Sequence, residues 1–198
     1  MAKLEIVVAT NNEHKLNELR DIFNGYDVAL YSLKDKNIEV DPEENGKTYA
    51  DNAFIKASAV AKLTELPVLS DDSGIEIEAL GDHFPGIYSH RYAVENNGQE
   101  NLNKKLVEEF AGTKARFVCH MVLLNLVKGE RLDFEGEMKG LVTNTIEGVN
   151  GFGYDPIFIP DGYKVTVASL SPEEKNHVSH RYNAAKKVLT YLVDNKII

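Results

Sequence analysis

Leu66-Pro67-Val68-Leu69-Ser70-Asp71-Asp72-Ser73-Gly74 is the stretch that decides the fold of this chain. Its apolar half predicts a short buried strand, and two carboxylates, a hydroxyl and a glycine follow at the strand's carboxyl end. Open α/β sheets bind their ligands at that end. Neighbouring aspartates repel each other and lose hydration in a cleft, and a cation such as Mg²⁺ relieves both costs. The alternative is an Asx turn with an exposed pair of carboxylates, so the rest of the chain has to decide.

Composition narrows the class of protein. The chain has 198 residues, 43% hydrophobic and 27% charged, and no Pro- or Gly-rich linker, so we expect a single globular domain over residues 1–198. Its formal charge of −9 opposes binding to a nucleic-acid backbone. No run of about 18 apolar residues predicts a membrane span. A single cysteine, Cys119, and an N-terminus without a signal peptide's apolar stretch favour the cytoplasm.

Hydrophobic periodicity predicts alternating strands and helices, followed by an antiparallel hairpin. The fold class we expect is therefore α/β, with a mixed twisted sheet flanked by helices. The segment 81–98 is rich in turn residues and is expected to be a loop. The predicted strands are residues 4–9, 28–31, 66–69, 115–127, 131–143 and 157–159; the predicted helices cover 16–23, 48–64 and 102–110, a helix that begins at Ser171-Pro172, and a C-terminal helix with its apolar face over 184–192.

The loop after the first predicted strand is a candidate anion site. It reads Thr10-Asn11-Asn12-Glu13-His14-Lys15 and leads into a helix, whose N-terminal N–H groups attract negative charge. Thr10, Asn12 and Lys15 add side-chain donors. The loop lacks the glycines and the GK[ST] sequence of a P-loop, and a capped strand-to-helix turn without a ligand is the alternative.

Three further groups of residues suggest a nucleotide site. Glu43 and Glu44 are placed to join Asp71 and Asp72 around a hard cation, with a solvated acidic loop as the alternative. Phe152-Gly153-Tyr154-Asp155 offers two aromatic rings beside a glycine, which suits a purine base but also a plain turn. Basic side chains at the last helices suit a phosphate or a base carbonyl, or they are merely solvated; they are Lys175, His177, His180 and Arg181.

Together these motifs resemble the inosine triphosphate pyrophosphatase family, the Ham1-like or RdgB-like enzymes that remove deaminated purine nucleotides. The resemblance spans nearly the whole chain. It rests on seven motifs in order: Thr10-Asn11-Asn12 with Lys15, Glu43-Glu44-Asn45-Gly46, Asn52-Ala53 with Lys56-Ala57, Ser70 to Gly74, Pro85 to Ser89 with Arg91-Tyr92, Gly151 to Pro156, and Ser179-His180-Arg181.

The resemblance implies a Mg²⁺-dependent hydrolase that cleaves ITP, dITP and XTP to the monophosphate and pyrophosphate. It also implies a homodimer and an elongated, two-lobed single domain with a central cleft. Asp72 matches the family's proton acceptor and metal ligand. The implied metal ligands are Glu43 or Glu44, Asp71 and Asp72, and the implied substrate contacts are Thr10, Asn11, Asn12, Glu13, His14, Lys15, Lys56, Ser73, Phe152, Gly153, Tyr154, Asp155, Lys175, His180 and Arg181.

The chain departs from the family pattern in the anion loop. Asn11 stands where the family usually has glycine, and so does His14. Asparagine tolerates a positive φ, so we expect the loop to keep its shape. Two other functions stay open: a nucleotide sensor that binds without turnover, and a triphosphatase that acts on other bases such as modified pyrimidines.

Overall fold

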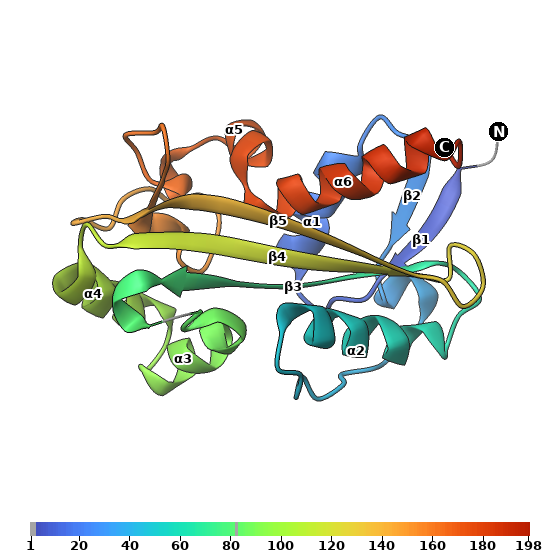
Figure 1. Cartoon of the computed structure of the whole chain (residues 1–198), viewed down its shortest axis with the longest axis horizontal. Coiled ribbons are helices and arrows are strands. Elements are labelled where there is room, and N and C mark those ends of the chain that lie inside the picture. The colour runs from blue at the N-terminus through green and yellow to red at the C-terminus, as the bar shows by residue number, and fades with distance from the viewer. Residues whose placement is uncertain (1–2, 82) are drawn as a thin grey trace. The chain divides into compact units, whose positions relative to one another are not determined.

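The computed structural model describes residues 3–81 and 83–198. In these ranges the chain forms six strands, in the sheet order β2-β1-β3-β4-β5-β6, and six α-helices (Figure 1). β1 pairs in parallel with β2 and β3, whereas β5 and β6 are antiparallel, which confirms an α/β fold with a mixed sheet. The strands are β1 (Leu4–Val8), β2 (Val28–Tyr31), β3 (Val68–Ile77), β4 (Lys114–Leu124), β5 (Arg131–Val142) and β6 (Phe158–Pro160); the helices are α1 (Glu13–Phe23), α2 (Tyr49–Ala61), α3 (Ser89–Glu95), α4 (Gln99–Phe110), α5 (Pro172–Val178) and α6 (His180–Asp194).

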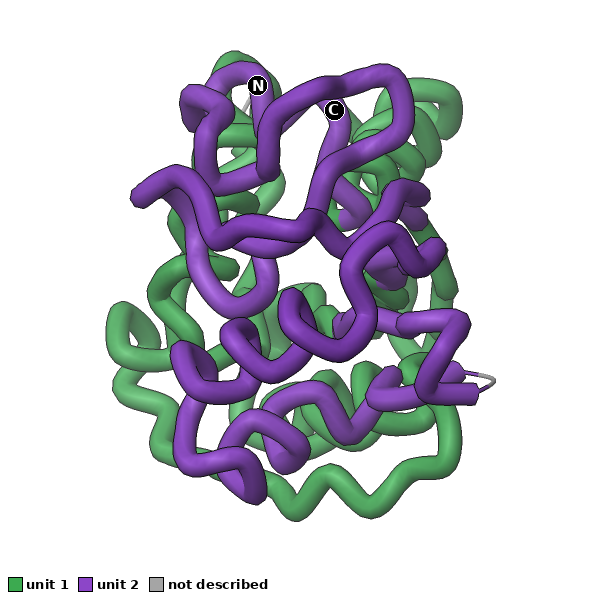
Figure 2. The backbone as a smooth tube through the Cα atoms, turned by 90° about the vertical axis from the view of Figure 1, so that its left-hand side faces the viewer, with its two compact units in different colours: residues 1–72, 119–136, 181–198 green, residues 73–118, 137–180 purple. Residues whose placement is uncertain are grey.

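Two compact units divide the chain (Figure 2). Unit 1 holds residues 1–72, 119–136 and 181–198, and unit 2 holds residues 73–118 and 137–180. The boundaries fall inside β3, β4 and β5, so these strands contribute residues to both units. That residues 1–198 act as one functional domain stays a prediction.

Unit 1 has a hydrophobic core on each face of its strands. On one face, Leu69 of β3 packs in the cluster that contains Leu19 of α1 and Val188 of α6. On the other face, Val68 belongs to the cluster that contains Ala57 of α2. Successive side chains of a strand point to opposite faces, so α1 and α6 cover one face and α2 covers the other (Figure 1).

Unit 2 is built around Ile75 and Ile77 of β3, which pack with Leu102 and Leu106 of α4. α3 lies in the segment expected to be a loop, and that expectation is wrong. The helix has seven residues and buries only Ser89 and Ala93, so it leaves no apolar periodicity in the sequence.

β3 does not end at Leu69 as expected but continues to Ile77, because apolar residues alternate again at Ile75 and Ile77. Its parallel neighbour β1 ends earlier, since the last pair in the register is Val8 with Leu69. Asp71 and Asp72 therefore lie within β3, just beyond the carboxyl end of β1.

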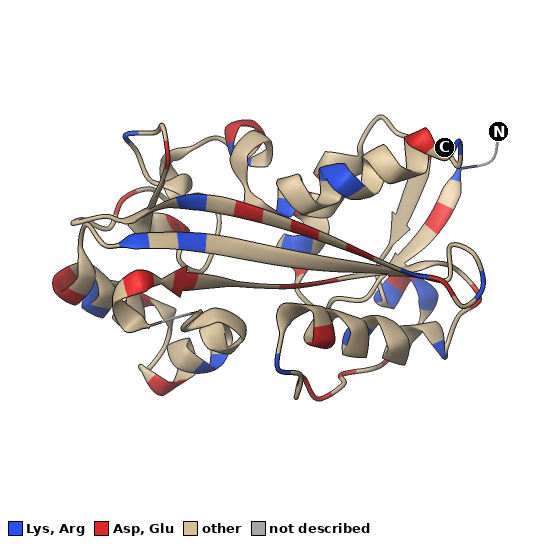
Figure 3. Ribbon diagram, viewed as in Figure 1, with Lys and Arg blue, Asp and Glu red and all other residues tan. Residues whose placement is uncertain are grey.

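The connection between β4 and β5, residues 125–130, is too short for a crossover, so these sheet neighbours run antiparallel as the hairpin prediction required. Charged residues occupy every second position of β5, at Arg131, Asp133, Glu135, Glu137 and Lys139, and both signs appear along the strand (Figure 3). No helix in the described ranges has both the length and the apolar composition that a membrane crossing needs.

Candidate active site

The anion loop joins β1 to α1. The Asn12 side chain caps α1, because its Oδ1 accepts from the N–H groups of His14 at 3.0 Å and Lys15 at 3.3 Å. The Asn12 N–H donates to Thr10 Oγ1 at 3.1 Å, which closes the turn. Neither Asn11 nor His14 is among the described residues with a positive φ. The backbone is therefore not strained by having these residues where the family usually has glycine. Asn12 thus shapes the loop with its side-chain oxygen, and its role as a donor through Nδ2 stays a prediction.

Asp71 faces α1 and α6. Its Oδ2 lies 3.1 Å from Lys15 Nζ and 3.2 Å from Arg181 Nη2, and the carboxylate is 1% exposed. Burial raises the pKa of Asp71, but the charges of Lys15 and Arg181 lower it more, so the pKa lies far below its usual range. Glu18 binds the other side of the Arg181 guanidinium through Nη1. Asp71 is therefore a buried anion held by two cations.

Asp72 faces α2 instead. Its Oδ2 accepts from Asn52 Nδ2 at 3.2 Å, and its Oδ1 lies 3.5 Å from Lys56 Nζ. Burial raises the pKa of Asp72, Lys56 and Lys15 lower it, and the Glu44 charge raises it; the net pKa is above the usual value. A carboxylate that burial destabilises in this way favours a nearby cation.

Asn52 also fixes the acidic segment before α2. Its Oδ1 accepts from the Gly46 N–H at 2.9 Å, and a Cβ at Gly46 would lie 2.6 Å from that oxygen, so only glycine fits there. This contact brings Glu44 to the site, where its carboxylate lies 2.8 Å from Lys56 Nζ. Glu43 is exposed, and its carboxylate makes no hydrogen bond or ion pair in the described part of the chain.

The four predicted metal ligands are not brought together. Asp71 and Asp72 project from opposite faces of β3, and no group of three or more His, Cys, Asp or Glu residues with a metal-binding arrangement occurs among the described residues. Glu44 and Asp72 share Lys56, which lies between them. Two carboxylates are enough for Mg²⁺, which keeps several waters and takes its other ligands from substrate phosphates. The donor set of Glu44 and Asp72 therefore fits Mg²⁺.

In unit 2 the predicted base-binding loop is organised by Asp155. Its Oδ2 accepts from the Phe152 N–H at 2.9 Å and from Lys175 Nζ at 2.8 Å. Lys175 lies 4.9 Å from the centre of the Phe152 ring. Tyr154 lies in the core of unit 2, and its hydroxyl donates to the Ser89 carbonyl at 2.8 Å. The loop thus presents one aromatic ring, Phe152, and not the two that the sequence suggested.

Three other predicted substrate residues lie on β3 and at the start of α6, and two of them are buried. His180 is buried and stacks on Phe117 with ring centres 4.8 Å apart. Arg181 is 1% exposed and belongs to the Asp71 network. Ser73 follows Asp72 directly on β3, where it is partly exposed.

The sequence interpretation missed Glu18 and gave Asn52 no role in the site. Glu18 is three residues from Lys15 on α1, so the two share a helix face, and this spacing was the available signal. For Asn52 the signal was its position four residues before Lys56 on α2.

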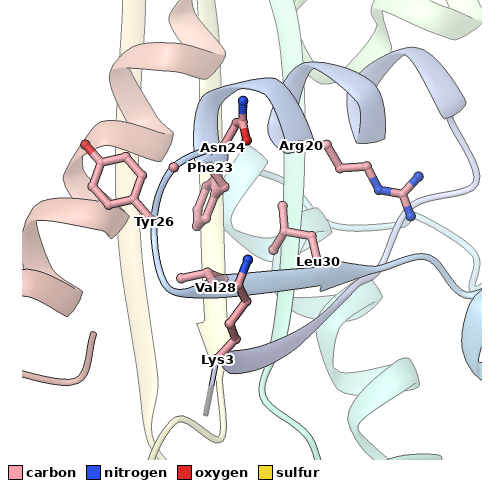
Figure 4. A pocket seen from close by; sticks show the side chains of 8 residues that line it. Lys3, Arg20, Phe23, Asn24, Tyr26, Val28 and Leu30 are labelled. Carbon is pink, nitrogen blue, oxygen red and sulfur yellow. The ribbon is translucent and has the colours of Figure 1, made fainter. Parts of the chain in front are cut away.

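A cavity of about 150 Å³ lies elsewhere, at the carboxyl end of α1 (Figure 4). None of the predicted site residues lines it; its walls are Lys3, Arg20, Phe23, Asn24, Gly25, Tyr26, Val28 and Leu30.

Fold and site together define an α/β protein with a capped anion loop beside buried, cation-paired carboxylates. The chain belongs to the Ham1 family, whose sequence profile matches residues 6–191. It is 38% identical over 195 residues to a dITP/XTP pyrophosphatase of Clostridium perfringens, covering 93% of this chain and 95% of that protein. The structure is similar to a HAM1 protein from Coxiella burnetii, with a TM-score of 0.84, 36% identity and coverage of 96% and 99%. A Staphylococcus aureus Ham1 protein matches with a TM-score of 0.82, 38% identity and the same coverage.

Proposed function

We propose that this chain hydrolyses the deaminated purine nucleotides ITP, dITP and XTP to the monophosphate and pyrophosphate, which removes them from the nucleotide pool. The observation that carries the proposal is Asp72, a buried carboxylate of raised pKa held between Asn52 and Lys56 beside the anion loop. A general base needs a pKa shifted toward the working pH, and burial supplies such a shift here. The dITP/XTP pyrophosphatase relatives support the same activity.

Lys15 and Lys56 suit the triphosphate. Without substrate, each ammonium is neutralised by carboxylates of the protein: Lys15 by Asp71, and Lys56 by Glu44 and Asp72. A triphosphate carries about four negative charges, so cations that neutralise its oxygens favour its binding. We assign these two lysines and the loop from Thr10 to Lys15 to the phosphates.

We assign Mg²⁺ to Glu44 and Asp72, and leave Asp71 and Glu43 outside its ligand set. When bound, the ion would neutralise phosphate oxygens and lower the pKa of a bound water. The remaining chemistry belongs to the chain: Asp72 accepts the proton of the attacking water, and Asn52 orients the Asp72 carboxylate through its Nδ2.

The base is assigned to residues of unit 2. Phe152 offers a ring for stacking, and Lys175 and His180 offer donors to the 6-oxo group of hypoxanthine or xanthine. A site that hydrogen-bonds an oxygen leaves its donors without partners against the 6-amino group of adenine, which costs affinity. Gly153, Tyr154 and Asp155 support this loop, and Ser73 completes the proposed substrate set; Arg181, which the resemblance also implied, is instead held by Asp71 and Glu18 in the interior of unit 1.

Pyrophosphate release from ITP, XTP, GTP, ATP and a modified pyrimidine triphosphate, with and without Mg²⁺, tests the proposal. We expect Mg²⁺-dependent release that is fastest with ITP and XTP. Fastest release from the pyrimidine would assign the chain to other bases, and tight ITP binding without release would make it a sensor; either result would refute the proposal.

Replacing the proposed base gives a second test. Asp72→Asn keeps an acceptor for Asn52 but cannot take a proton at neutral pH, so turnover should fall at least about a hundredfold. An unchanged circular dichroism spectrum and melting temperature would show that the fold is intact, and a rate within a few-fold of the wild type would remove Asp72 from the mechanism.

We also propose that the chain forms a homodimer and works in the cytoplasm. Light scattering at micromolar concentration measures the first, and a single-chain mass would contradict it. Cell fractionation measures the second.

A further inference from the structure

Four charged side chains of unit 1 form a buried network that connects α1, β3 and α6. It runs from Lys15 through Asp71 and Arg181 to Glu18. Arg181 and Asp71 are each 1% exposed, Lys15 is 14% exposed and Glu18 is 15% exposed. The two positive and two negative charges cancel within the network, as burial requires.

The contacts of the Asp71 carboxylate with the described residues converge on one oxygen, Oδ2. Oδ2 lies 3.1 Å from Lys15 Nζ, and it accepts from Arg181 Nε at 3.3 Å and Nη2 at 3.2 Å. Oδ1 is buried and has no hydrogen-bond partner among the described residues. Oδ1 is therefore the atom that a metal ion would have to use if Asp71 were a ligand.

Lys15 and Glu18 lie one turn apart on α1; Lys15 is the last residue of the anion loop, and Glu18 follows it. The network therefore anchors the first turn of α1 to β3. Glu18 matters because it offers Arg181 a second carboxylate, and without it two cations would compete for the single charge of Asp71.

We propose that Asp71 is a positioning residue, whose buried carboxylate holds Lys15 in place for the triphosphate while Glu18 balances Arg181, and that it does not ligate the metal. This inference rests on the proposed function. It separates the two neighbouring aspartates by role: Asp72 meets the reacting groups, and Asp71 acts through Lys15.

A double-mutant cycle tests the coupling. Asp71→Asn should raise KM for ITP about tenfold, the value of one charge-assisted contact, and change kcat less. Lys15→Met should do the same. Both variants remove the same interaction, the contact of Lys15 with the triphosphate. The KM of the double variant Lys15→Met/Asp71→Asn should therefore rise no further than that of Lys15→Met. If Asp71 were purely structural, its replacement would raise KM further in the double variant. Asp21→Asn, an exposed position of α1, is the matched control and should leave KM unchanged.

Titration with Mg²⁺ separates positioning from ligation. In Asp71→Asn the Mg²⁺ concentration for half-maximal rate should stay within twofold of the wild type, whereas Glu44→Gln should raise it about tenfold because a ligand is lost. A comparable rise in Asp71→Asn would overturn the proposal and make Asp71 a ligand through Oδ1. Unchanged KM and kcat in Asp71→Asn would overturn it as well.

If Asp71→Asn does not fold, two other variants test the proposal. The double variant Lys15→Met/Asp71→Asn keeps the Arg181–Glu18 pair and a balanced charge. Glu18→Gln should raise KM in the wild-type background and should have no effect on KM when Lys15→Met is also present. If the wild type does not turn over ITP, the proposed function fails, and the same cycle is measured on ITP affinity by calorimetry without Mg²⁺. Additive losses there would overturn the inference independently.

Discussion

At the scale of single residues, the pleat of β3 gives neighbouring aspartates different partners. Asp71 shares the face of Leu69 and meets α1 and α6, while Asp72 shares the face of Ser70, whose hydroxyl donates to the Ala53 carbonyl of α2 at 2.6 Å. The sequence identified both carboxylates. It could not divide them between two faces, because that required knowing that the strand continues through them.

Asn52 offers a test of how Asp72 is tuned. In Asn52→Asp the new side chain can still accept from the Gly46 N–H, but it replaces a donor to Asp72 by a second negative charge. The pKa of Asp72 should rise further, and a shift of one unit corresponds to about a tenfold loss of the ionised form in the affected pH range. The pH–rate profile measures this as an acidic limb that moves to higher pH.

The control for that variant is Asn101→Asp on α4, where the side chain is exposed and donates to the Asn97 carbonyl. Its pH–rate profile should match the wild type. An Asn52→Asp profile that also matches the wild type would show that Asn52 does not act on Asp72.

At the scale of elements, α2 carries both Asn52 and Lys56. The position of its first turn therefore determines where these two side chains lie in the site. A capping box fixes that turn: Thr48 Oγ1 accepts from the Asp51 N–H at 3.1 Å, and Asp51 Oδ2 accepts from the Thr48 N–H at 3.1 Å. Thr48→Ala should cost about 1 kcal/mol in the free energy of unfolding, measured with urea, whereas Thr48→Ser keeps the hydroxyl and should stay close to the wild type. Equal losses in both variants would mean that the hydroxyl does not stabilise the helix.

Elements with strong local signals were predictable. Ser171 and Pro172 predicted the start of α5, and the structure shows the capping box there. Where packing decides, the sequence was a weaker guide: β3 continues past Leu69 because Ile75 and Ile77 enter the core of unit 2, and α3 has too few buried residues to show a period. Lys56 and Lys15 were recognised as cations, but their carboxylate partners come from distant segments, which periodicity does not reveal.

At the scale of the whole molecule, the buried network links stability to pH. The pKa of Asp71 is lowered in the folded protein, so this group stabilises the fold above its unfolded pKa of about 3.9, and the contribution is lost as pH falls toward the folded value. At neutral pH, Asp71→Asn should cost about 3–5 kcal/mol, because it leaves an uncompensated positive charge among Lys15, Arg181 and Glu18.

The lowered pKa of Asp71 predicts that the stability difference between the wild type and Asp71→Asn depends on pH. A difference caused only by lost packing would not depend on pH. Below about pH 3.9 the wild type should lose up to about 1.4 kcal/mol of stability per pH unit relative to Asp71→Asn, because only the wild type has this carboxylate to protonate. The difference between the two proteins should therefore shrink from pH 5 to pH 3 in urea unfolding. A difference that stays constant over that range would mean that the neutral and charged forms of Asp71 support the fold equally, and that Lys15 and Arg181 are not held by its charge.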